Sequence, residues 1–368
     1  MIPFASFDKP VVGLDIGTTA IKAVELRRSG RQWSVHRVGW KPLPPKAVAG
    51  GKIKEKEIVV QTLRELWAEC RFGCKRVAIG VGGPSVIIKR IPLALMSELD
   101  LEDQIALEAE EHIPFDIEEV YLDFQILERG AEQMDVMLTA CKKELVDNRL
   151  EAPREAGLNP VLCDLDLFGM INAFGQFCPA AAGSHPPKTA KNHKSDPAAK
   201  IESTALVNAG ASHLSVAILT HGVPEFIRDH AFGGERLLQE LQQQNNLSAE
   251  EAEQMIRQGH DSQNRPWSPA QRQPMIQAFA EQMSGLIRQS VDFHNASHGN
   301  QKVGSVHVSG GCALLPELPA RLGELLNLPV HKVNPVSGLH GTVPAALRPD
   351  NATGFLVALG LALRGDAP

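Results

Sequence analysis

One segment of this chain occurs twice, and this repeat restricts the possible folds more than any other feature. Leu14 to Val24 reads LDIGTTAIKAV, and Val207 to Ala217 reads VNAGASHLSVA, aligned without gaps at a constant offset of 193 positions. Each copy has two β-rich runs joined by a turn of small residues, which predicts a β-hairpin. Each is followed by a third extended run and then a helical stretch. A duplication of about half the chain predicts two similar α/β halves that face each other.

The first hairpin also has the chemistry of an anion site. Small turn residues let backbone N–H groups approach an anion closely. Asp15 lies at the mouth of this turn, and Lys22, seven residues later, can point back across it. Taken alone, this pattern fits an ordinary hairpin of the protein core, with no bound anion, equally well. Because the pattern recurs, we favour two turns that hold one phosphate chain and its metal ion from opposite sides.

Composition excludes several classes of protein. The chain has 368 residues, of which 43% are hydrophobic and 5% aromatic, and a formal net charge of −6. This is ordinary for an α/β protein of two or more lobes and disfavours a broad nucleic-acid surface. Its six cysteines form no CxxC pair, which favours small buried side chains in a reducing cytoplasm. We expect no secretory signal and no membrane span, so any work at a membrane would require recruitment there.

Changes in composition along the chain predict its domain organisation. We expect a distinct acidic insert that interrupts the first lobe, and a flexible linker rich in Ala, Pro and Lys between the lobes. The histidines His294 and His298 have a metal-compatible spacing, but we expect them to be solvated at a helix end. The predicted segments are the first lobe at 1–84, the insert at 85–156, the return to the first lobe at 157–178, the linker at 179–202, the second lobe at 203–340, and a C-terminal helix at 341–368 that returns to the first lobe.

Three motifs together resemble a known superfamily. LDIGTTAIKAVEL, NAGASHLSVAIL and VHVSGGCALLPEL (306–318) resemble the first-phosphate, second-phosphate and adenosine motifs of the actin/Hsp70/sugar-kinase ATPases. Within that superfamily, ALEAEEHIPFDIEEVYLDFQIL (106–127) and ALGLALR (358–364) resemble the PilM family of type IV pilus assembly proteins. The resemblance implies a duplicated actin-like (ribonuclease H-like) α/β fold. Its two lobes would surround a nucleotide cleft, with an α+β subdomain inserted in the first lobe.

The resemblance also implies a site for ATP and Mg²⁺. Asp15 and Asn208 would hold the metal ion through water. Lys22 would offset the phosphate charge, and Glu253 and Arg257 would face ribose and adenine, although the family's basic residue falls on Ile256 here. The remaining implied contacts are Gly17, Thr18 and Thr19 in the first turn, Gly210, Ala211 and Ser212 in the second, Gly233 and Gly234 at a helix start, and Gly310, Gly311 and Leu314 along the adenosine, where Ser309–Gly311 would begin the next helix.

One residue departs from the superfamily pattern. The second-phosphate motif normally starts with aspartate, and here that position is Asn208. The substitution removes a negative charge near Mg²⁺, and a charge pair at roughly 4 Å is worth about 4 kcal/mol at an effective dielectric of about 20, before solvation is subtracted. We therefore expect ATP binding with slow or absent hydrolysis.

The resemblance further implies a role and a place in the cell. The chain would be a cytoplasmic scaffold, peripheral at the inner face of the bacterial inner membrane, in the platform that assembles type IV pili. Its partners would be the N-terminal cytoplasmic tail of a PilN-type membrane protein and other platform proteins, with no nucleic acid. The tail would lie between the first lobe and the 85–156 insert. ATP binding to both lobes would favour their closure and so alter partner contacts.

Two alternatives remain open at this stage. A small-molecule, sugar-type kinase of the same superfamily would need a carboxylate base, for which Asp164 or Asp166 could serve. We favour a capping role for these two residues, on the helix expected at 167–177. An actin-like protein that polymerises in cell division is the other alternative.

Overall fold

The computed structural model describes residues 10–182, 201–260, 264–297, 301–348 and 351–366. Its two largest sheets repeat one topology. The first sheet has the strand order β10-β6-β1-β2-β3 and the second the order β15-β14-β11-β12-β13. The strands of the first are β1 (Val12–Ile16), β2 (Ala20–Ser29), β3 (Gln32–Pro42), β6 (Arg76–Val81) and β10 (Asn159–Leu165); those of the second are β11 (Ile201–Ala209), β12 (Leu214–Thr220), β13 (Val223–His230), β14 (Gln301–Ser309) and β15 (Val330–Lys332).

The two sheets correspond strand for strand and also in register. β1 pairs antiparallel with β2 and parallel with β6, and β11 pairs in the same way with β12 and β14. Asp15 lies opposite Lys22 in the first hairpin, and Asn208 lies opposite Ser215 in the second. The predicted duplication and two-lobed α/β fold are therefore confirmed.

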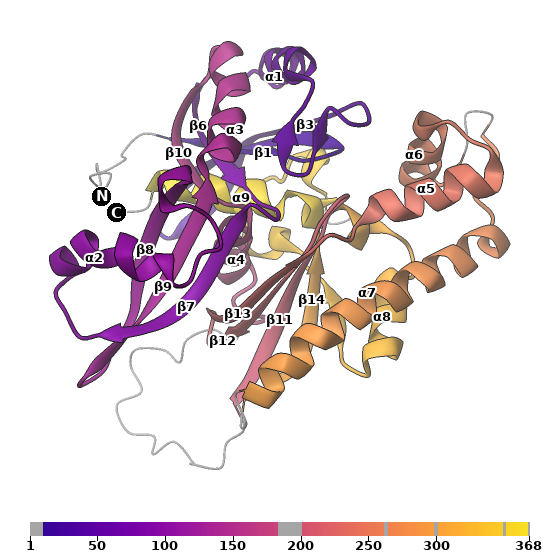
Figure 1. Ribbon diagram of the computed structural model, residues 1–368. Helices are drawn as coiled ribbons and strands as arrows, with labels where there is room; N and C mark the ends of the chain where they lie inside the picture. Colours follow the sequence, from indigo (N-terminus) through magenta and orange to yellow (C-terminus); the bar gives the residue numbers. More distant parts are fainter. Residues whose placement is uncertain (1–9, 183–200, 261–263, 298–300, 349–350, 367–368) are drawn as a thin grey trace.

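Two helices lie between the sheets and join the lobes (Figure 1). They are α4 (Asp166–Phe177) and α9 (Leu356–Leu363), and both belong to one apolar cluster with Val24 of the first sheet and Leu206 of the second. The helices approach so closely that a Cβ at Gly360 would lie 1.6 Å from the carbonyl oxygen of Gly169. These mainly apolar helices are buried against both sheets, so the two lobes share one hydrophobic core.

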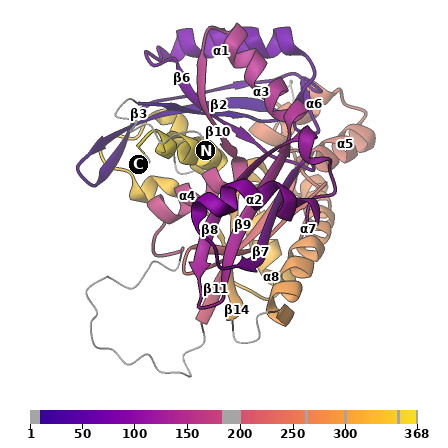
Figure 2. The ribbon, with the colours of Figure 1, turned by 60° about the vertical axis from the view of Figure 1, so that its left-hand side comes forward.

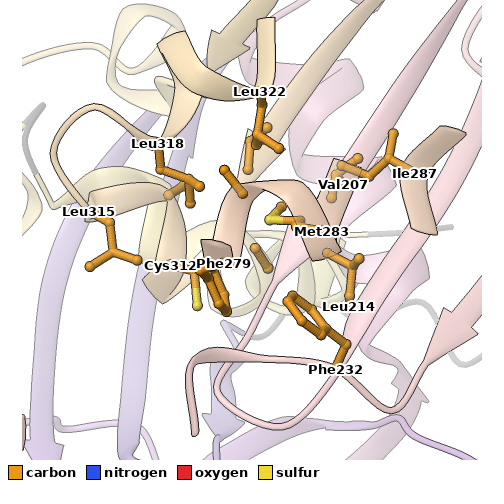
Figure 3. Packing of buried hydrophobic residues seen from close by; sticks show 14 of the residues in the cluster. Val207, Leu214, Phe232, Phe279, Met283, Ile287, Cys312, Leu315, Leu318 and Leu322 are labelled. Atoms are coloured by element: carbon orange, nitrogen blue, oxygen red, sulfur yellow. The ribbon is translucent and has the colours of Figure 1, made fainter. Parts of the chain in front are cut away.

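Separate helices cover the outer faces of the sheets. α1 (Lys56–Cys70) and α3 (Lys143–Glu155) pack on the first sheet, near the short strands β4 (Val48–Ala49) and β5 (Lys52–Ile53). The second sheet is covered by the long helix α7 (Pro269–Ser297) and by α8 (Leu318–Leu326), while α5 (Gly234–Asn245) packs on α7 and on α6 (Ala249–Gln258). Figure 3 shows side chains of this second outer core, among them Val207, Leu214, Phe232, Phe279, Met283, Ile287, Cys312, Leu315, Leu318 and Leu322.

The segment after β6 forms a third sheet beside the lobes (Figure 2). Its order is β7-β9-β8, from β7 (Val86–Ala94), β8 (Val120–Arg129) and β9 (Gln133–Lys142). Helix α2 (Glu98–Glu110) starts with a capping box at Ser97 and buries Leu101, Ile105 and Ala109 in the core that it shares with this sheet. We call the residues 86–142 of these elements the insert. Helix α3 follows β9 directly and contacts α1 and the first sheet, and the domain boundaries predicted from composition stay a proposal.

Three local expectations from the sequence either differ from the structure or lie outside the described residues. His294 is fully buried in α7, so the prediction of a solvated helix-end histidine is wrong for it; the helix packs that face against the sheet. His298 and residues 183–200 of the predicted linker lie outside the described residues. Ser309–Gly311 does not open an α-helix: a 3-10 helix covers Gly311–Leu314, preceded by Gly310 with a φ of +88°.

Within the described residues, two negative findings bear on membranes and metals. None of the helices there is long and apolar enough to cross a membrane. No group of three or more His, Cys, Asp or Glu side chains in the same residues could by itself hold a metal ion.

Candidate functional site

The two repeated turns have the same internal geometry. The N–H of Gly17 donates to the carbonyl oxygen of Ala20 over 3.0 Å, and that of Gly210 donates to the carbonyl oxygen of His213 over 2.9 Å. These donors and acceptors are again related by the offset of 193 positions. The shared bond leaves the intervening residues as a tight tip at the end of each hairpin.

The tips of the two turns meet. Thr18 Oγ1 lies 2.9 Å from Ser212 Oγ, and Ser212 Oγ lies 2.9 Å from Nδ1 of His213. The structure therefore brings together, side chain to side chain, two segments that are half a chain apart in sequence. A nucleotide held at this point would contact both lobes at once.

Charged side chains gather behind the first turn. Lys22 Nζ lies 3.1 Å from Oδ2 of Asp15, and Lys22 is therefore placed across the turn mouth. Burial and the nearby charge of Asp15 raise the pKa of Asp166 to about 7, although the cations Arg149 and Lys22 oppose the rise. Asp166 also lies directly on β6, since a Cβ at Gly80 would be 1.8 Å from its Oδ1.

The helix-cap expectation for the two aspartates is wrong. α4 begins at Asp166 itself, its N-cap residue is Leu165, and no side chain caps it. Asp164 instead forms an ion pair with Arg364 at 2.9 Å, just after α9. α4 starts one residue earlier than its apolar pattern indicates, and Asp166 lies against Gly80 of β6.

Arg149 is a residue of this cluster that sequence reasoning missed. It is 5% exposed, its Nε donates to the carbonyl oxygen of Gly51 over 2.6 Å, and its Nη1 donates to the carbonyl oxygen of Ile16. The available signal was an arginine in helical register with the apolar residues Leu145 and Ala152 of α3. An unpaired arginine on a buried helix face would be costly, so such a position indicates a specific partner.

In the second lobe, backbone contacts hold the turn. The N–H of Gly234 donates to the carbonyl oxygen of Gly210 over 3.0 Å, and that of Glu235 donates to the carbonyl oxygen of Ala211 over 2.8 Å. A Cβ at Gly233 would lie 2.3 Å from that oxygen of Ala211. The start of α5, predicted to face the nucleotide, therefore uses its first N–H groups to hold the second turn in place.

Asn208 lies at the end of β11, beside the loop predicted to face adenosine. A Cβ at Gly310 would lie 2.6 Å from Oδ1 of Asn208, so only glycine fits this approach. Gly311 follows, and the Leu314 side chain is 41% exposed although it is large and apolar. Asn208 and this loop thus adjoin each other.

The predicted ribose and adenine contacts lie farther along the second lobe. Glu253 is a half-buried residue of α6, a helix that packs on α5. The backbone of Arg257 belongs to the same helix, but its side chain lies outside the described residues. The role of both residues stays a prediction.

The residues gathered here fit a nucleotide with a divalent metal. Carboxylate and amide oxygens, as on Asp15 and Asn208, are ligands that Mg²⁺ prefers, commonly through water. Lys22 and Arg149 supply positive charge, and the small residues of the two turns allow an anion to approach the backbone.

Two similar lobes with this sheet order, two phosphate-type turns and two helices crossing between them define the fold of the actin-like ATPases, a nucleotide-binding class. Comparisons with known proteins agree. A structure titled "PilM-PilN type IV pilus biogenesis complex" matches with a TM-score of 0.81 and 25% identity over 98% of this chain and 99% of that one. The ethanolamine utilization protein EutJ from Carboxydothermus hydrogenoformans matches with a TM-score of 0.57 and 15% identity over 98% and 91% of the chains.

The particular family follows from the sequence. Residues 13–366 match the family described as type IV pilus assembly protein PilM, and the chain belongs to that family. Membership confirms the resemblance drawn from the motifs. It does not favour the sugar-kinase or cell-division alternatives.

Proposed function

We propose that this protein binds ATP with Mg²⁺ between its two repeated turns. Asp15 and Asn208 hold the metal ion through water, and Lys22 offsets the phosphate charge. The contact between Thr18 and Ser212 carries this proposal, because it places the two turns within reach of one phosphate chain. The phosphates are received by the backbone of Gly17, Thr18 and Thr19 in the first turn and of Gly210, Ala211 and Ser212 in the second.

The nucleoside lies against the second lobe. Gly310 and Gly311 let the backbone approach the adenosine, and the exposed side chain of Leu314 covers it. Gly233 and Gly234 support the second turn from behind. Glu253 and Arg257 of α6 face ribose and adenine.

Hydrolysis of the bound ATP is slow or absent. Asn208 keeps an oxygen for a metal-bound water but brings no charge, so the second lobe contributes less to ordering Mg²⁺ than an aspartate would. The protein then uses ATP mainly as a ligand that stabilises contact between the lobes.

The second part of the proposal is a scaffold that binds the N-terminal cytoplasmic tail of a PilN-type membrane protein. Family membership and the similarity to the PilM-PilN complex support it. The insert has exposed apolar side chains suited to a peptide partner, and Tyr121 among them donates to Oδ1 of Asp147 on α3 over 3.2 Å. The tail lies between the insert and the first lobe, near that contact. The other exposed apolar residues of the insert region are Leu95, Leu99 and Leu107.

Through this partner the protein sits at the inner face of the bacterial inner membrane. There it joins the other proteins of the pilus assembly platform and binds no nucleic acid. Nucleotide binding alters lobe closure and so the contacts made with the platform.

Thermal unfolding tests both parts of the proposal. ATP with Mg²⁺ at about 100 times its Kd should add roughly 2.7 kcal/mol of stability, and the tail peptide should add its own increment. A scrambled peptide and a sugar are the matched controls. If ATP produces no shift, the nucleotide site is contradicted. If the peptide produces no shift, the scaffold is contradicted, and a shift that requires the sugar favours a kinase.

A further inference from the structure

Arg149 joins three parts of the chain at a buried point. Its guanidinium group donates to the carbonyl oxygen of Ile16, the residue directly before the first turn, and to that of Gly51 in the loop before β5. The group also faces the carboxylates of Asp15 and Asp166, whose charges act on it. Arg149 thus contacts the base of the first turn from the side opposite to its tip.

Packing alone does not account for this residue. Removing a guanidinium group from water costs several kcal/mol, and a hydrophobic residue of similar volume often gives equal or greater stability. The neighbouring residue Asn148 already ties α3 to β5, since its side chain accepts from the N–H of Ile53 over 2.7 Å and donates to the carbonyl oxygen of Ile53 over 3.0 Å. The positive charge of Arg149 balances the carboxylates of Asp15 and Asp166, and it therefore leaves the base of the first turn less negative toward an incoming anion.

The helix that bears Arg149 is continuous with the insert. β9 ends at Lys142 and α3 begins at Lys143, with no residue between them. β9 is also the central strand of the insert sheet. A displacement of the first turn that moves Arg149 would therefore act on α3 and, through it, on β9.

We propose that Arg149 is a positioning residue that shapes the first turn for phosphate and transmits the occupancy of that turn to α3 and the insert. The inference rests on the proposed nucleotide site. It adds a specific route by which ATP reaches the surface where the partner peptide binds. Arg149 acts from behind the backbone of the turn, through the carbonyl oxygen of Ile16.

The first test measures nucleotide affinity by calorimetry for the wild type, Arg149→Met and Arg149→Lys, with ATP and with AMP. Arg149→Met should weaken ATP with Mg²⁺ about tenfold or more, as expected for a lost hydrogen bond to a charged group, and leave AMP unchanged. Arg149→Lys should recover part of the ATP affinity. Arg154→Met, at an exposed position of the same helix, is the control and should bind both nucleotides like the wild type.

The outcomes separate the possible failures. If the wild type does not bind ATP, the proposed function and this inference both fail. If it does, equal affinities for ATP in the wild type and Arg149→Met overturn the inference alone. Equal losses for ATP and AMP also overturn it, because they indicate a purely structural role.

A second test needs no variant, in case Arg149→Met does not fold. Hydrogen exchange of the wild type with saturating ATP and Mg²⁺ should slow at the amides of α3 and the adjoining end of β9 as well as at the two turns. Protection confined to the turns, with α3 and β9 unchanged, would rule out transmission through Arg149.

Discussion

The two repeated turns share a backbone and differ in charge. In the first, Asp15 faces Lys22 across the hairpin, with Arg149 and Asp166 close behind. In the second, the corresponding facing pair is Asn208 and Ser215. The second turn is held mainly by backbone bonds from the start of α5. Duplication has therefore kept the shape of the turn in both lobes, while the pair that faces across the turn mouth is charged only in the first; in the second, Ser215 bonds to the carboxylate of Asp229.

The largest expected effect tests whether the buried carboxylate of Asp166 behind the first turn destabilises the protein when it is ionised. The pKa of Asp166 is about 7 in the folded protein and 3.8 in the unfolded reference, so the folded state binds more protons between these values. Stability of the nucleotide-free protein should fall as the pH rises from about 4 to about 7. Asp166→Asn should remove this loss and stabilise the protein by on the order of 1 kcal/mol or more near pH 8, with little change near pH 4.

Chemical unfolding of both proteins across this pH range measures the difference. Glu119→Gln, an exposed carboxylate far from the turns in sequence, is the control and should change stability by less than about 0.5 kcal/mol at any pH. If the stability of Asp166→Asn depends on pH in the same way as that of the wild type, ionisation of Asp166 does not destabilise the folded protein.

The next effect compares equivalent positions of the two hairpins. Lys22→Met should weaken ATP binding by about 10- to 100-fold, because a charged hydrogen-bond donor is lost. Ser215→Ala should have a much smaller effect, since Ser215 is uncharged and bonds to Asp229 in its own lobe. Calorimetric titration of ATP measures both, and equal losses would contradict the division of charge between the turns.

A third prediction restores charge to the second turn. Asn208→Asp should speed phosphate release about tenfold or more, because a second carboxylate then helps to order Mg²⁺. Asp15→Asn, the reverse change in the first lobe, should lower both ATP affinity and phosphate release in the same assay. The slow-hydrolysis proposal fails if the unmodified protein already releases phosphate at the rate of an efficient ATPase.

The smallest effect concerns the contact between the tips. Thr18→Ala and Ser212→Ala should each cost about 0.5–1.5 kcal/mol of stability or less, as expected for one hydrogen bond that is partly accessible. A double-mutant cycle on thermal unfolding should show a coupling energy of about 0.5 kcal/mol or more. A coupling of zero would mean that the turns do not hold each other in solution.

Local pattern was enough to predict much of the fold. The two hairpins and the facing of Asp15 and Lys22 depend on contacts between residues near in sequence. The repeat then predicted that two such units pair, since each needs a partner to bury its apolar face. The family was also accessible from the sequence, and the nucleotide contacts remain predictions.

Other features could not be predicted, because they depend on elements distant in sequence. Nothing near Arg149 indicates that its guanidinium group meets the carbonyl oxygen of Ile16, which lies far earlier in the chain. The burial of His294 depends on which face of α7 meets the sheet. Asp166 was expected to cap a helix, and the packing of α4 on β6 instead placed it in the charged cluster.

The sequence by itself determined two matched hairpins, their register and the difference in charge between them, because strand pairing and turn formation are short-range. Only the tertiary structure decided that Thr18 meets Ser212 and that Arg149 lies behind the first turn. Those positions depend on how α4 and α9 pack between the sheets, where close contact of backbones such as Gly169 and Gly360 fixes the distance between the lobes.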